Sequence, residues 1–99
     1  MKTIFTIAGV GYSEGPAVQG LRNKAFCWHS SFEQAEEAVL KNIGDMYESG
    51  YYPYLVIEEY GEGQWKCKKE WWYVFDDATN TFVSCTVPDF AKNSFGWVF

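Results

Sequence analysis

Only one stretch of the sequence has the spacing of an amphipathic helix, and this limits the chain to a fold built mainly of strands. Ser30 or Ser31 can cap this helix, with Glu33 or Gln34 three residues on to close a capping box. We therefore predict one principal helix over about residues 31–48. Its apolar residues fall on one stripe: Phe32, Ala35, Ala38, Val39, Ile43, Met46 and Tyr47.

The rest of the chain has the composition of strands and turns. Four segments rich in apolar and β-branched residues are predicted strands: residues 2–10, 54–61, 65–76 and 81–87. A loop rich in glycine and polar residues is expected over about residues 11–24. The order β-α-β-β-β predicts a single α+β domain over residues 1–99, with the helix packed on a mainly antiparallel sheet.

Aromatic residues are too numerous for one helix to cover. The chain has five Trp, seven Tyr and eight Phe, whereas a helix about 10 Å wide covers only one face of a sheet about 19 Å wide. We expect the second face, or an edge, to meet the C-terminal tail, another subunit or a ligand. The apolar ending FGWVF favours a docked tail, and a homodimer or higher oligomer is predicted through this face, an edge or the tail.

Charge and cysteine content favour a cytoplasmic protein, in a bacterium or an infected host cell. The net charge of -5 disfavours binding to long nucleic acids or to an anionic membrane. No apolar run approaches the roughly 20 residues that span a bilayer, and the start MKTIFTIAGVG is interpreted as a strand rather than a signal peptide. Cys27, Cys67 and Cys85 are odd in number and widely spaced, which predicts free thiols.

The stretch GVGYSEGP invites comparison with phosphate-binding loops. Its glycines, Gly9, Gly11 and Gly15, do not have the spacing of a dinucleotide fingerprint, and the predicted helix begins some fifteen residues later. Two interpretations stay open: a bend at the end of a strand, or a binding loop of another kind. The first is the preferred interpretation. Arg22 and Lys24, which lie in the same segment and are two of only eight basic residues, are the observation in support of the second.

Catalytic and metal-binding patterns are weak, so we predict no enzyme, no cofactor and no metal. Cys27 and His29 can form a thiolate pair, but no third group is assigned to orient them. Adjacent Glu58 and Glu59 point to opposite faces of a strand, although one of them can face inward toward a ligand hydroxyl or a basic side chain. The candidate zinc ligands lack C-x-x-C knuckles: Cys27, His29, Cys67 and Cys85.

Residues 30–63, about a third of the chain, resemble a group of short uncharacterised proteins from bacterial and phage genomes. This resemblance implies a small intracellular protein of phage or prophage type, for which a counter-defence role is expected. It carries over no functional residue. The shared pattern is formed by Phe32, Ala35, Glu36, Ala38, Val39, Asn42, Asp45, Glu48, and Tyr52 or Tyr54 before Val56, Ile57, Glu58 and Glu59.

Two function classes follow. The first is a non-enzymatic protein that sequesters a nucleotide-like signal in an aromatic pocket, where rings stack on a base and local cations hold phosphates. The backbone N–H groups of Gly11 and Gly15 would form an anion nest. The alternative is an inhibitor of a host or defence protein that uses an acidic helix surface formed by Glu33, Glu36, Glu37, Asp45 and Glu48. Such a pattern is more often a solvated helix face whose acids match the helix dipole. The predicted ligand-binding residues are Tyr12, Ser13, Arg22, Lys24, Trp28, His29, Lys68 and Trp71.

Overall fold

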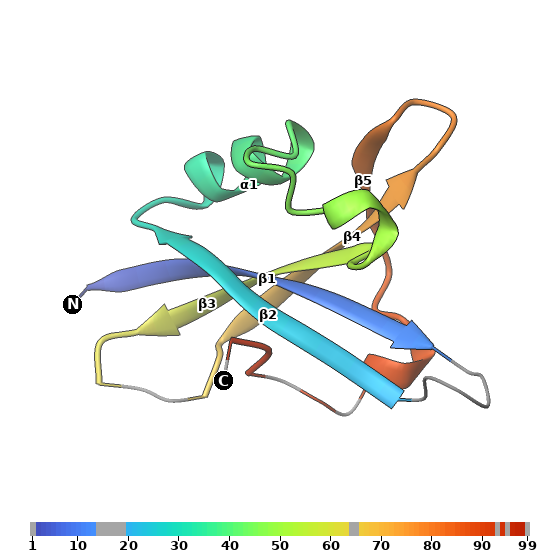
Figure 1. The fold of residues 1–99 in the computed structure, drawn as a ribbon. Helices are drawn as coiled ribbons and strands as arrows, with labels where there is room; N and C mark the ends of the chain where they lie inside the picture. Colours follow the sequence, from blue (N-terminus) through green and yellow to red (C-terminus); the bar gives the residue numbers. More distant parts are fainter. Residues whose placement is uncertain (1, 14–19, 64–65, 93, 95, 99) are drawn as a thin grey trace.

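A computed structural model describes residues 2–13, 20–63, 66–92, 94 and 96–98. Five antiparallel strands form one sheet in the order β2-β1-β3-β4-β5 (Figure 1). The helix α1, Phe32–Leu40, packs on one side of this sheet. The predicted α+β class and helix-on-sheet arrangement are confirmed. The strands are β1 Thr3–Ser13, β2 Gly20–His29, β3 Tyr54–Gly61, β4 Lys69–Asp76 and β5 Thr81–Cys85.

The structure contains one strand more than the sequence predicted, because β2 occupies part of the expected loop. β1 continues to Ser13 and pairs with β2, so that Gly11 lies opposite Arg22. β2 is an edge strand with mostly exposed side chains. Since neither of its faces is well buried, the sequence of this strand has no clear alternation of apolar and polar residues. Residues 14–19, which include Gly15, lie outside the described part of the chain.

The helix is shorter than predicted. Ser31 caps its start, accepting a hydrogen bond from the Gln34 N–H at 3.2 Å. The helix ends at Leu40 because Asn42, Gly44 and Asp45 take left-handed backbone angles, with φ of 47°, 70° and 56°. Two residues of the predicted apolar stripe beyond this end, Met46 and Tyr47, still pack in the same core as α1. Ile43, which was predicted to belong to the stripe, is 55% exposed.

The sheet has two faces. We call the face covered by α1 the helix face, and the face covered by residues after β5 the tail face. Successive side chains of each strand point alternately to one face and the other. On β3, Leu55 and Ile57 point to the helix face, whereas Val56 points to the tail face. The helix face carries the larger core, with these buried residues: Ile7, Ala35, Ala38, Val39, Met46, Leu55, Ile57, Tyr73 and Phe82.

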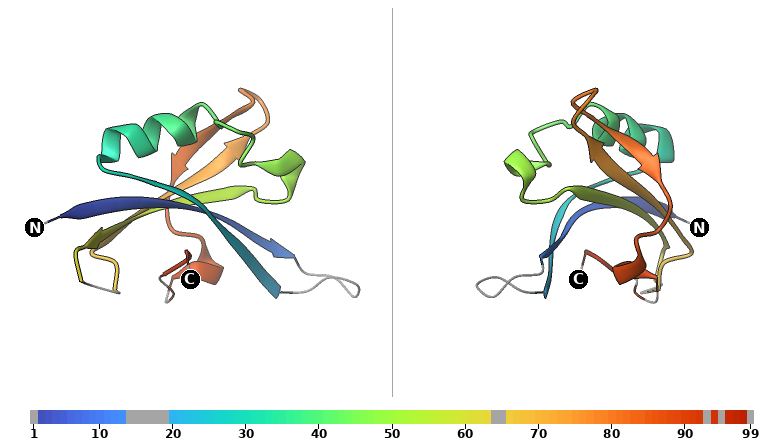
Figure 2. Two further views of the ribbon diagram at one scale, coloured as in Figure 1. Left: turned by 60° about the vertical axis from the view of Figure 1, so that its left-hand side comes forward. Right: turned by 90° about the vertical axis from the view of Figure 1, so that its right-hand side faces the viewer.

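The tail face is covered by the chain after β5, which begins with a short 3-10 helix, η2, at Asp89–Ala91. Figure 2 shows this segment on the side of the sheet opposite α1. Trp97 is 6% exposed and its ring lies 5.6 Å from that of Trp72. The expected docking of the tail is therefore present in residues 96–98, and the predicted oligomer stays a prediction. Within the described segments, no helix has the length and apolar character needed to cross a membrane.

Candidate functional site

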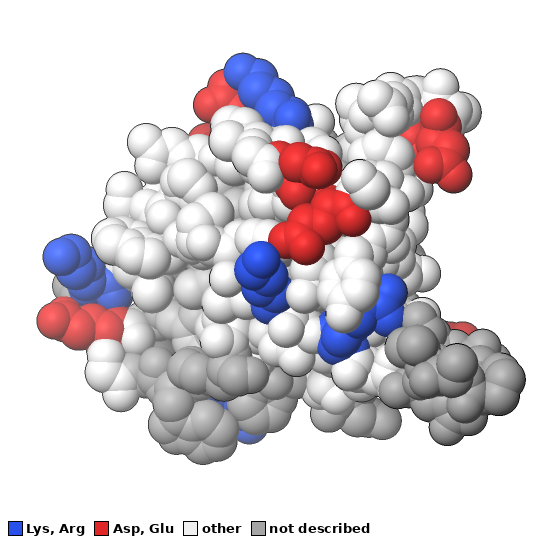
Figure 3. Space-filling model, viewed as in Figure 1, with Lys and Arg blue, Asp and Glu red and all other residues white. Residues whose placement is uncertain are grey.

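Two of the predicted phosphate-binding residues, Arg22 and Lys24, lie together on the helix face of β2. The Arg22 Nε donates to the Tyr51 carbonyl at 3.0 Å, and its guanidinium lies 4.4 Å from the centre of the Tyr51 ring. Lys24 pairs with Glu48 at 3.0 Å, and this hydrogen bond raises the pKa of Lys24. Figure 3 shows basic and acidic surface adjoining over this part of the molecule. Both cations are thus engaged by groups of the protein itself.

Gly9 and Gly11, two of the three glycines in GVGYSEGP, are part of this same packing. Gly9 and Gly11 lie inside β1 rather than at a bend or in a binding loop. A Cβ at Gly9 would come within 2.6 Å of the Phe26 ring and 2.8 Å of the Tyr52 ring. A Cβ at Gly11 would come within 2.6 Å of the Arg22 guanidinium. Glycine at these positions lets the neighbouring side chains lie directly on the strand.

Other predicted site residues are divided between the two faces. Tyr12 stacks on Phe90 on the tail face, with ring centres 5.2 Å apart. Trp28 is 61% exposed and lies opposite Thr6 in the β1–β2 ladder. His29 lies opposite Phe5, whose ring packs against the helix-face core. Ser13 is the last residue of β1.

Lys68 lies just before β4 and Trp71 lies within it, with the strands β1 and β3 between β4 and β2. Lys68 is exposed, and Trp71 packs against Phe32 with ring centres 4.5 Å apart. Trp71 also lines a cavity of about 430 Å³, whose lining includes the acidic residues Glu36 and Glu70. No Lys or Arg is among the described residues that line it, so its charge is unsuited to a phosphate. The predicted ligand-binding residues therefore do not form one pocket.

A different cavity opens on the tail face, at the end of the sheet where β1 begins and β3 ends. Its volume of about 380 Å³ lies within the roughly 300–1,000 Å³ of small-molecule sites. Thr6 links it to the exposed Trp28, which is its neighbour across the ladder. The cavity is lined by residues of β1, β3, the turn after β3 and the tail: Lys2, Ile4, Thr6, Tyr60, Gly61, Glu62, Gly63 and Val98.

Polar groups in this cavity are few. The Thr6 hydroxyl is buried and donates to the Glu58 carbonyl at 3.4 Å. Tyr60 is 5% exposed, and its burial beside the Glu58 carboxylate raises the pKa of its hydroxyl. The Lys2 backbone carbonyl accepts the Glu62 N–H at 2.8 Å, which fixes the turn at the rim. A flat, mostly apolar molecule with a few hydrogen-bonding atoms matches such a lining.

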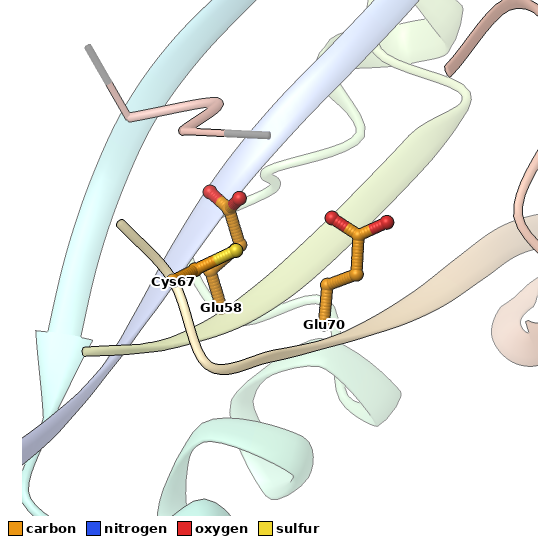
Figure 4. A group of neighbouring side chains, drawn as sticks. All are labelled: Glu58, Cys67 and Glu70. Carbon is orange, nitrogen blue, oxygen red and sulfur yellow. The ribbon is translucent and has the colours of Figure 1, made fainter. Parts of the chain in front are cut away.

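Three ionisable side chains lie behind Tyr60, and all three point to the tail side of the sheet: Glu58, Cys67 and Glu70 (Figure 4). Each offers one ligand atom, and these atoms lie within 4.8 Å of one another. Glu58 is fully buried and holds the tail, because its carboxylate accepts the N–H groups of Gly96 at 2.7 Å and Trp97 at 2.8 Å. Burial raises the pKa of Glu58, while these two bonds act in the opposite direction.

The other two members of this cluster are partly buried. Burial, together with the Glu58 carboxylate, raises the pKa of the Cys67 thiol to about 11. The Oε1 atom of Glu70 accepts the Trp72 indole N–H at 3.0 Å. Its Oε2 atom is buried and has no hydrogen-bond partner among the residues that the structure describes. All three cysteines of the chain lie in the described segments and are free thiols.

Sequence reasoning missed most of this site. It named Glu58 or Glu59 as a residue that can face inward, and the structure places Glu58 there and leaves Glu59 half-buried on the other face. The alternation of the segment YLVIEEY contains this signal, since a strand covered on both faces must bury one of two adjacent glutamates. Cys67 was named among the candidate zinc ligands, but with Cys27, His29 and Cys85 rather than with the two glutamates that the structure places beside it. Thr6 and Tyr60 have no comparable signal, because the tail residues near them are distant in sequence.

Comparisons of the chain with known proteins identified no relative. No protein-family model matches the chain, and neither the search of curated proteins nor the search of solved structures gave a match.

Proposed function

We propose that this protein is a non-enzymatic binding protein that sequesters a small nucleotide-like molecule in the cavity of the tail face. The observation that carries the proposal is the cavity of about 380 Å³, whose size and mainly apolar lining suit a planar group such as a nucleobase. Ile4, Tyr60 and Val98 supply apolar surface against the flat faces of the base. The Thr6 hydroxyl, whose proton is donated to the Glu58 carbonyl, keeps acceptor capacity for an N–H at the edge of the base.

The charge of the ligand is recognised at the rim. Lys2 lines the cavity and is exposed, so its ammonium group can reach an anionic substituent such as a phosphate. The described lining contains neither His nor Cys, which favours binding over nucleophilic chemistry. A protein that holds a signal molecule without converting it removes that molecule from solution, in agreement with the counter-defence role that the sequence resemblance implies.

The alternative function, an inhibitor that presents an acidic helix surface, receives less support. Paired carboxylates offer a weaker field to a basic partner than free ones do. Two of the five carboxylates of this surface form ion pairs within the protein, Glu37 with Lys41 and Glu48 with Lys24. Glu36 and Asp45 are hydrogen-bonded to the neutral side chains of Tyr73 and Asn42 and keep their charge.

Calorimetry against a panel of cyclic and linear nucleotides tests the proposal. We expect at least one nucleotide to bind with a Kd below about 100 μM. Ile4→Trp fills the cavity and should abolish this binding, while Lys2→Ala should weaken it by roughly 10- to 150-fold through loss of a charged hydrogen bond. Lys92→Ala is the matched control, because Lys92 is also exposed and pairs with Asp89 away from the cavity.

Two results would contradict this proposal. One is that no nucleotide on the panel binds the wild-type protein. The other is that Ile4→Trp, shown by thermal melting to be folded, binds as tightly as the wild type. Arg22→Ala separates the two locations: a loss of affinity in this variant alone would return the site to the helix face of β2.

A further inference from the structure

The cluster of Glu58, Cys67 and Glu70 brings together side chains of a kind that binds metal ions. Glu58 on β3 and Glu70 on β4 are direct neighbours in the antiparallel ladder and point to the same face. Like charges directly opposite each other destabilise a sheet, and here one of the two carboxylates is fully buried. Cys67, in the connection between the two strands, adds a thiol whose sulfur lies within 4.8 Å of both carboxylates.

The hydrogen bonds around the cluster leave one carboxylate oxygen unsatisfied. The groups that act on Glu58 are the N–H groups of Gly96 and Trp97, the Cys67 thiol and the Glu70 carboxylate, and none of them is a cation. The Oε2 atom of Glu70 is buried and has no hydrogen-bond partner within the described segments. A buried carboxylate oxygen without a hydrogen-bond partner destabilises the folded protein. A bound cation would remove this destabilisation and the repulsion between the two carboxylates.

We propose that Glu58, Cys67 and Glu70 form a binding site for a divalent cation of the zinc class. One sulfur and two oxygen ligands select Zn²⁺ or Co²⁺ over Mg²⁺ and Ca²⁺, which prefer oxygen alone. Three protein ligands leave a fourth position for water or another group. The spacing Cys67-x-x-Glu70 contributes two ligands from one short segment, and Glu58 supplies the third from the neighbouring strand.

The geometry requires only a small contraction. Zinc bonds of about 2.3 Å to sulfur and 2.0–2.2 Å to oxygen place tetrahedral ligand atoms about 3.3–3.7 Å apart. The ligand atoms of the cluster lie within 4.8 Å of one another, so rotation of the two half-buried side chains, Cys67 and Glu70, is sufficient. On binding, the metal–sulfur bond forms as the thiol proton of Cys67 leaves to solvent, and no oxidant or reductant is involved.

Cobalt titration of the metal-free protein tests this site directly. The protein is stripped with a chelator, kept reduced with a phosphine, and titrated with Co²⁺ and then Zn²⁺ alone, without any nucleotide. We expect one equivalent of Co²⁺ to produce a thiolate-to-cobalt charge-transfer band in the near ultraviolet, and Zn²⁺ to displace it. Cys67→Ser should abolish the band, and Glu70→Gln should raise the Kd by at least about tenfold.

The other two cysteines provide matched controls. Cys85→Ser and Cys27→Ser should keep the band, the second although the Cys27 sulfur lies 3.7 Å from His29. Glu58 is left unchanged because its carboxylate also holds the tail. The proposal is overturned if the wild type gives no band, if the band survives in Cys67→Ser, or if Cys27→Ser removes it. Should Cys67→Ser prove unfolded by circular dichroism, unchanged affinity in Glu70→Gln overturns it equally.

Discussion

The two faces of the sheet are covered by different means and contain different chemistry. On the helix face, α1 and the residues after it close an apolar core in which Leu55, Ile57 and Phe82 are almost wholly buried. On the tail face, a smaller apolar cluster that contains Val56, Trp72 and Trp97 lies beside a cavity and a cluster of ionisable side chains. The helix is tied to the sheet by many apolar contacts, whereas the tail is held in part by its hydrogen bonds to Glu58.

This difference indicates that one face mainly stabilises the fold and the other mainly binds ligands. Apolar burial is the main source of folding free energy, so the helix face should determine the stability of the sheet. Buried polar groups cost free energy unless they are paired, and a protein keeps them where binding requires them. We therefore assign most of the folding stability to the helix face and ligand binding to the tail face.

The largest expected effect comes from the helix-face core. Phe82→Ala should lower the free energy of unfolding by about 3–5 kcal/mol, because the ring is 1% exposed and its removal leaves a cavity. Urea denaturation followed by circular dichroism measures this loss. A change below 1 kcal/mol would show that the helix face does not dominate stability.

A smaller effect is expected at Gly9, where the backbone of β1 packs closely against two aromatic rings. Gly9→Ala forces a methyl group against the Phe26 and Tyr52 rings and should destabilise the protein by about 1–3 kcal/mol. Gly11→Ala is the matched control, since its methyl group meets the far end of the Arg22 side chain, which can move away. Equal midpoints of thermal unfolding for the two variants would refute this distinction.

Trp97→Ala probes the tail face. A buried Trp in a core costs about 3–5 kcal/mol when truncated, but a tail that can detach alone limits the loss to its own docking free energy. We expect a loss below about 3 kcal/mol, accompanied by faster proteolysis near the C-terminus. A loss as large as that of Phe82→Ala, measured under the same conditions, would make the tail part of the folding core.

The smallest effect on stability is expected from removing a hydrogen bond between Tyr73 of β4 and Glu36 of α1. The Tyr73 hydroxyl donates to Glu36 at 2.7 Å, and Tyr73→Phe should cost about 1 kcal/mol at neutral pH. Burial and this hydrogen bond raise the pKa of Tyr73 above its ordinary value of 10, so the native state holds the proton longer than the unfolded state. Stability should therefore fall as the pH rises past about 10, and less steeply in Tyr73→Phe.

Much of the helix face could be predicted from the sequence, because its signals are local. The Ser31 cap and the stripe that contains Ala35 and Val39 are written in consecutive residues. β2 escaped prediction because an exposed edge strand has little apolar alternation. The early end of α1 depends on left-handed angles at Asn42 and Asp45, which residue preferences alone do not specify.

The candidate site on the tail face could not be predicted, because it is assembled from segments far apart in the chain. Thr6, Tyr60 and Val98 meet only after the tail crosses the sheet. The residues chosen from sequence, such as Arg22 and Lys24, share a local charge pattern, and in the structure this pattern serves contacts with Tyr51 and Glu48. A cluster of cations in sequence therefore indicated packing at an edge strand rather than a pocket.

Native-state hydrogen exchange tests the division between the two faces most directly. The amides of Gly96 and Trp97, which donate to the Glu58 carboxylate, are compared with those of Leu55 and Val56 near the start of β3, the central strand of the sheet. We predict that the tail amides exchange through a local opening, with a free energy of opening lower than that measured for the β3 amides. We also predict that the free energy of this local opening does not change with denaturant concentration. Equal opening free energies with the same denaturant dependence in both segments would contradict the account, because the tail would then unfold only with the sheet.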